Sequence, residues 1–144
     1  MIDDDPYHLD RFVAAQREIY DVALNEIRSG RKQSHWMWFI FPQIDGLGSS
    51  PAARHYAIKS RDEAAAYLRH PLLGARLQEC AAAALGISER SARDIFGSPD
   101  DLKLRSSATL FAAVAPKESV FERLLQHYFN GERDQRTLDL LRAR

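Results

Sequence analysis

The sequence lacks an excess of charge of either sign. Its 144 residues include 20 lysines and arginines and 20 aspartates and glutamates, so its formal net charge at pH 7 is zero. A protein that coats nucleic acid nonspecifically needs a clear excess of basic residues, and we therefore expect no such partner. An acidic disordered chain is also excluded, because 45% of the residues are hydrophobic and 10% are aromatic.

The chain also has little cysteine and no long apolar run. The single cysteine, Cys80, can form neither an internal disulfide nor a cysteine-based zinc site by itself. The longest apolar stretch, residues 36–42, is much shorter than the roughly 20 residues of a membrane-spanning helix. Residues 1–6 show neither the basic region nor the apolar core of a secretory signal. These absences predict a soluble, cytoplasmic protein without a membrane partner.

Repeats, linkers and low-complexity tracts are absent as well, which predicts one domain over residues 1–144. A chain of this length buries about two thirds of its unfolded surface, so folding requires no metal or disulfide. The histidines form no pair four residues apart and no His-Glu-x-x-His motif, so we expect no metal site and no cofactor. They are His8, His35, His55, His70 and His127.

Most of the local signals in the sequence mark where helices begin and end. Apolar residues at helical spacing predict a first helix over residues 9–27, which Gly30 ends. Ser60 and Glu63 form a capping box before another helix. The Ser-Pro-Asp-Asp run at residues 98–101 predicts a helix over residues 98–115, and Asp134 can cap a last one. Evidence for a strand is confined to residues 33–41. We therefore predict an all-α fold of about seven helices, with an irregular aromatic-rich loop after the first.

That loop differs in composition from the rest of the chain. Residues 30–43 read GRKQSHWMWFIFPQ and contain both tryptophans. Flat apolar side chains beside a few basic groups suit a pocket for a small anionic or aromatic metabolite, such as a nucleotide. The predicted pocket surrounds residues 30–48, and Lys103 and Ser107, four apart on one helix face, join it. The predicted ligand-binding residues are Arg31, Lys32, His35, Trp36, Trp38, Gln43, Lys103 and Ser107.

Two other interpretations of this segment remain open. Its aromatic side chains are equally suited to core packing, and Lys32 and His35 to a solvated surface. Alternatively, the aromatic segment is an exposed hot spot of a protein–protein interaction module that catalyses nothing. Exposure of Trp36 and Trp38 distinguishes these cases. Residues that line a concave cavity favour a ligand, whereas a flat exposed patch favours a protein partner.

Candidate catalytic residues are few. His35 and His55 are acid–base candidates, because histidine titrates near neutral pH. Asp45 is a candidate carboxylate for glycosidic hydrolysis, although its place in a turn explains it equally well. We expect Cys80 to be a buried structural thiol, because its neighbours are apolar. Ser106, Ser107 and Thr109 lie within a predicted helix, where hydroxyls often donate to the carbonyl one turn earlier.

The segment at residues 30–43, with the Gly-Leu-Gly run at 46–48, resembles the DUF1810 family. Further matches are HPLLG at residues 70–74, DDLKLRSS at 100–107 and Asp134 with Thr137. The resemblance covers nearly the whole chain; one departure is Ala108, where family members carry methionine. It implies a compact, mainly helical fold and assigns no function. The calpastatin label that some members carry does not transfer, because calpastatin inhibitory segments are disordered.

The chain is also similar in pattern to the NADAR group, helical domains that cleave N-glycosidic bonds in ADP-ribose and related nucleotides. The shared pattern is an early tryptophan-bearing segment and a basic helix later in the chain. This similarity implies a hydrolase of the N-glycosidase type. No NADAR catalytic residue matches a residue of this sequence, so the similarity assigns no catalytic role.

Overall fold

A computed structural model describes residues 4–144. The first three residues of the predicted domain, which belong to the stretch examined for a secretory signal, lie outside this range. The described residues form ten helices and no strand, so the all-α prediction is confirmed with more helices than expected. The helices are α1 (Asp10–Gln16), α2 (Tyr20–Arg28), α3 (Met37–Ile40), α4 (Pro51–His55), α5 (Arg61–Arg69), α6 (Leu73–Leu85), α7 (Ala92–Phe96), α8 (Asp100–Ala112), α9 (Val120–Phe129) and α10 (Gln135–Arg142).

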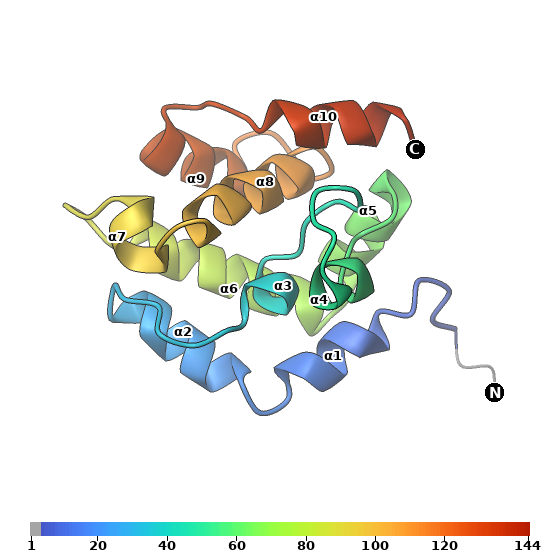
Figure 1. Cartoon of the computed structure of the whole chain (residues 1–144), viewed down its shortest axis with the longest axis horizontal. Coiled ribbons are helices and arrows are strands. Elements are labelled where there is room, and N and C mark those ends of the chain that lie inside the picture. Colours follow the sequence, from blue (N-terminus) through green and yellow to red (C-terminus); the bar gives the residue numbers. More distant parts are fainter. Residues whose placement is uncertain (1–3) are drawn as a thin grey trace.

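The first predicted helix is two helices, α1 and α2, with a break at residues 17–19. Phe12 of α1 and Ile27 of α2 are both fully buried. The break turns the chain so that each helix presents its apolar face to the core from its own direction (Figure 1). Helical spacing of apolar residues continues across the break, so the pattern alone does not reveal it.

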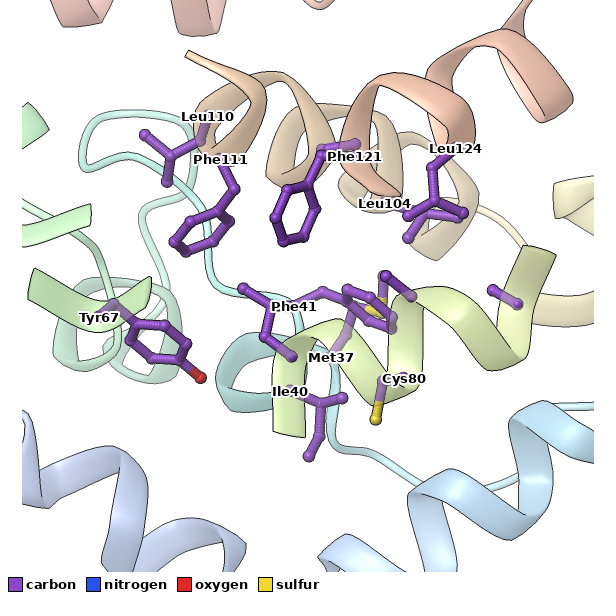
Figure 2. Close-up of a cluster of buried hydrophobic side chains, with 14 of the residues drawn as sticks. Met37, Ile40, Phe41, Tyr67, Cys80, Leu104, Leu110, Phe111, Phe121 and Leu124 are labelled. Atoms are coloured by element: carbon purple, nitrogen blue, oxygen red, sulfur yellow. The ribbon is translucent and has the colours of Figure 1, made fainter. Parts of the chain in front are cut away.

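Residues 33–41, where the only evidence for a strand lies, form no strand. Residues 37–40 form the single turn of α3, and the only extended pairing among the described residues is an isolated parallel bridge between Ile44 and Ile58. A helical turn brings Met37, Ile40 and Phe41 to one side, where all three are buried. Figure 2 shows these side chains within the core cluster. A strand would have directed neighbouring residues to opposite faces.

The core lies around the alanine-rich helix α6, which packs against α2, α5 and α9. Figure 1 shows α1 and α2 along one side of the molecule and α8, α9 and α10 along the other. In the close-up, Phe111 of α8 and Phe121 of α9 point toward Phe41 from the opposite side (Figure 2). The aromatic segment therefore enters the centre of the fold and connects its two sides.

Glu26 of α2 holds the start of the aromatic segment. Its Oε1 accepts hydrogen bonds from Gln33 N (2.9 Å), Ser34 N (3.0 Å) and Trp36 Nε1 (2.9 Å). Its Oε2 accepts one from Ser34 Oγ (2.7 Å). Burial alone would raise the pKa of Glu26, but these donors outweigh it and lower the pKa to about 2. A charged carboxylate thus fixes the loop between α2 and α3.

Five of the ten helices within residues 4–144 begin at a side-chain cap. Ser60 Oγ accepts from Glu63 N and Asp134 Oδ2 accepts from Thr137 N, as expected of N-cap residues, but the Glu63 carboxylate accepts from Lys59 N and does not complete the predicted capping box. Helix α8 departs from its prediction: it begins at Asp100, after Pro99, and Ser98 does not cap it. None of the helices within residues 4–144 combines the length and apolar character that crossing a bilayer requires.

Candidate functional site

A cleft of about 500 Å³ opens between residues 43–50, the start of α4, α8 and α10. This volume lies within the range of small-molecule sites, roughly 300–1,000 Å³. Its apolar walls include Trp38, Leu47, Tyr56 and Leu102. Its charged lining residues are Lys103, Arg105, Asp134 and Arg136.

One wall is the loop at residues 43–50, which is fixed at both sides. Ile58 N donates to Gln43 O (2.9 Å), and Asp45 N donates to Ile58 O (2.8 Å). Gly46 then turns the chain at a φ of 107°, in the region that favours glycine. From α10, the guanidinium of Arg136 donates to Gly46 O at 3.0 Å. The loop is therefore attached to α10.

The facing wall is the N-terminal half of α8. Ser106 lies four residues after Leu102 and three after Lys103, and all three line the cleft. Ser106 Oγ lies 3.2 Å from Leu102 O and 2.9 Å from Asp134 Oδ2. Thr109 Oγ1 donates to Arg105 O at 2.8 Å, so the expected bond to a preceding carbonyl is confirmed at Thr109, whereas the shorter contact of the Ser106 hydroxyl is to Asp134.

The cationic groups of the cleft are incompletely paired. Lys103 Nζ lies 3.4 Å from Asp100 Oδ1 and 5.4 Å from the Trp38 ring centroid. Arg105 Nε is buried and has no hydrogen-bond partner among the described residues. Neither Arg105 nor Arg136 forms an ion pair within residues 4–144. The cleft therefore offers two guanidinium groups that no carboxylate among the described residues pairs with directly.

A smaller hollow of about 270 Å³ adjoins the cleft and shares Trp38, Pro99 and Lys103 with it. Lys32 and His35 also line this hollow. The Lys32 side chain is only 6% exposed, and its Nζ lies 2.8 Å from Asp100 Oδ2. The same ammonium lies 5.0 Å from the Trp36 ring centroid. Lys32 is thus already paired within the fold.

The structure brings together five of the predicted ligand-binding residues. Lys32, His35, Trp38 and Lys103 line the hollow, while Gln43, Trp38 and Lys103 line the cleft. The other three line neither cavity: Trp36 is fully buried, Ser107 is 1% exposed, and Arg31 is exposed. Trp36 belongs to the core because Glu26 satisfies its indole N–H and aromatic rings surround it. The Ser107 hydroxyl is buried without a partner among the described residues.

The three candidate catalytic residues do not converge. His35 lines the hollow, whereas His55 is exposed and packs against the Tyr56 ring, 4.6 Å between centroids. Asp45 lies in the turn, 3.4 Å from Lys59 Nζ and 3.6 Å from the Arg144 guanidinium. No cavity described above contains two of the three.

Within residues 4–144 we find no candidate site for a metal ion or for a reactive thiol. Residues 4–144 contain no group of three or more His, Cys, Asp or Glu side chains suited to a metal ion. Cys80 is buried, as expected, and burial raises the pKa of its thiol to about 12.

Sequence reasoning missed Arg105, Asp134, Arg136 and Tyr56 as lining residues. Arg105 belongs to the same motif as Lys103, and of the two hydroxyls that follow it Ser106 lines the cleft whereas Ser107 does not. Asp134 was recognised only as a helix cap. Arg136 carries no local signal, because its place at the cleft depends on how α10 docks over residues 43–50.

A family model and one solved structure match this chain. No curated protein matches the chain. A crystal structure of the conserved hypothetical protein Rv1873 from Mycobacterium tuberculosis is similar, with 52% sequence identity and a TM-score of 0.94, over 96% of this chain and 99% of that one. The family model described as "Protein of unknown function (DUF1810)" matches residues 6–141, so the chain belongs to the DUF1810 family.

Proposed function

We propose that this domain binds a small anionic metabolite with a flat ring, such as a nucleotide, in the cleft between residues 43–50, α8 and α10. The observation that carries the proposal is Arg105, which lines the cleft, forms no ion pair among the described residues and has no hydrogen-bond partner at Nε. An anionic ligand at the terminal nitrogens of this guanidinium would supply the counter-ion that the fold does not.

Two further cations support an anionic ligand. Arg136 lies at the same cleft, and its one hydrogen bond within the described residues goes to Gly46 O. Lys103 reaches the cleft from α8. A planar guanidinium can bind a phosphate or carboxylate through two parallel hydrogen bonds, so the pair of arginines suits such a group better than lysines alone.

Aromatic walls support the flat ring. Trp38 is half-buried and lines both cavities, where its ring borders the positive charge of Lys103. Tyr56 also lines the cleft and packs against Phe39, 5.3 Å between ring centroids. Rigid aromatic surfaces next to a few directed polar groups are typical of cofactor and nucleotide sites.

The interaction-module alternative has weaker support. Trp36 and Phe41 of the aromatic segment are at most 1% exposed. The exposed large hydrophobic residues among residues 4–144 lie on separate elements; they are Val22, Leu72 and Leu102. Binding hot spots cluster around aromatic anchors, and scattered single residues do not form one.

Thermal denaturation with ligands tests the proposal. We expect adenosine monophosphate, ADP-ribose or NAD to raise the melting temperature, since a ligand at 100 times its dissociation constant stabilises by about 2.7 kcal/mol. The variant Arg105→Gln should melt normally alone but lose the ligand-induced rise. The matched control is Arg142→Gln on α10, whose side chain is 72% exposed and which should respond as the wild type does. No response to any of the three ligands, or an undiminished response in Arg105→Gln, contradicts the proposal.

A further inference from the structure

Asp134 is the one acidic side chain that lines the cleft among the described residues. Its position is firmly set. Its Oδ2 accepts hydrogen bonds from Ser106 Oγ (2.9 Å), Thr137 N (3.3 Å) and the Thr137 hydroxyl. Its own backbone N–H donates to Thr109 Oγ1 at 2.9 Å. The carboxylate is therefore fixed at the junction of α8 and α10.

The three hydrogen bonds to the Asp134 side chain all use one carboxylate oxygen, Oδ2. Oδ1 has no hydrogen-bond partner within residues 4–144, and it is not among the buried, unsatisfied atoms. Asp134 also forms no ion pair with Arg105 or Arg136, although all three line the same cleft. An accessible carboxylate oxygen accepts hydrogen bonds and donates none, so it recognises an O–H or N–H group.

A carboxylate in a cationic cleft repels a simple anion such as inorganic phosphate. It favours a ligand that places an anionic group at the arginines and a hydrogen-bond donor at Asp134. Acidic side chains recognise the hydroxyls of ribose in this way in dinucleotide-binding folds. Resting on the proposed function, we propose that Asp134 Oδ1 accepts a hydrogen bond from the ribose diol of the ligand, so that the cleft selects ribonucleotides over 2′-deoxyribonucleotides.

The proposal is tested by calorimetric titration with adenosine 5′-monophosphate and its 2′-deoxy counterpart. Hydrogen bonds to charged groups are strong enough that the wild type should bind the ribonucleotide about tenfold more tightly. Asp134→Asn should bind both nucleotides equally, with the deoxynucleotide bound at least as tightly as by the wild type, because the repulsive charge is gone. Asparagine caps helices as well as aspartate does, so this variant should retain its fold.

Two controls separate recognition from structure. Asp139→Asn changes a 60% exposed carboxylate on the same helix and should keep the wild-type preference. Inosine monophosphate, which lacks the amino group of adenine, should bind Asp134→Asn with the same loss as adenosine monophosphate if the diol is the donor. Loss confined to the adenine nucleotide would instead identify the base as the donor and overturn the proposal.

Other outcomes distinguish this inference from the function on which it rests. Equal binding of the ribonucleotide and deoxynucleotide by the wild type, with both dependent on Arg105, would overturn only the role of Asp134. Equal weakening of both nucleotides in Asp134→Asn would also overturn it, since a purely structural role predicts that result. Failure of every nucleotide to bind would overturn both proposals.

Discussion

Replacing Glu26 with glutamine tests how the aromatic segment is held. The carboxylate accepts four hydrogen bonds, from Gln33 N, Ser34 N, Ser34 Oγ and Trp36 Nε1, which lower its pKa from the usual 4.5 to about 2. Such a difference corresponds to about 3 kcal/mol of stability at neutral pH. Because the side chain is partly exposed, solvent reduces this contribution, and we expect about 2 kcal/mol.

The sign of the pH dependence follows from the lowered pKa. The stabilising contribution of Glu26 is complete above its unfolded pKa of 4.5 and is lost as the pH falls toward about 2. Urea denaturation should therefore show Glu26→Gln less stable than the wild type by about 2 kcal/mol at pH 7 and by about 1 kcal/mol at pH 3.5.

The control is Glu18→Gln, an exposed glutamate on the turn between α1 and α2 that should change stability by less than about 0.5 kcal/mol. If the difference between Glu26→Gln and the wild type stays the same from pH 7 to pH 3.5, the charge of Glu26 does not hold the loop. In that case the shape of the side chain, and not its ionisation, positions residues 33–36.

Two more predictions concern the packing around α6. Gly74→Ala should destabilise the protein by about 2 kcal/mol or more in urea denaturation, because the new Cβ would lie 2.1 Å from Leu68 O. The control is Gly86→Ala, whose new Cβ would have its nearest neighbouring atom at 3.4 Å and which should be close to neutral. Equal effects of the two substitutions would show that α5 and α6 separate at little cost to admit the new methyl group. Cys80 should react with a thiol reagent only on unfolding, because burial raises its pKa to about 12, and rapid reaction of the native protein would contradict that burial.

Most of the fold could be predicted because helix starts and stops are local. The cap at Ser60 needs only its own residue and the next turn, and the same holds for Asp134. The errors arose where tertiary packing decides. Residues 37–40 are rich in residues that favour strands, yet they form a helical turn because the core accepts Met37, Ile40 and Phe41 from one direction.

The candidate site was only half predictable for a related reason. Composition pointed to residues 30–48, and Trp38 and Gln43 do line the cleft. Composition does not tell which aromatic ring faces inward, and Trp36 fills the core while Trp38 borders the cavity. The other half of the cleft comes from residues about 60 to 90 positions later in the chain, such as Lys103 and Arg136. A pattern within one segment carries no information about such long-range docking.

The zero net charge of the chain is compatible with an anion site because charge acts locally. Of the four charged residues that line the cleft, three are basic and one is acidic. Screening by salt at physiological ionic strength limits each exposed charge to a range of about 8 Å, so acidic residues elsewhere on the surface do not cancel this group. The equal numbers of acidic and basic residues disfavour the binding of polyanions. A long nucleic acid contacts a wide surface, where it meets acidic residues as often as basic ones. A neutral surface with a cationic cleft therefore favours a small anion over a polymer, and raising the salt concentration should weaken nucleotide binding.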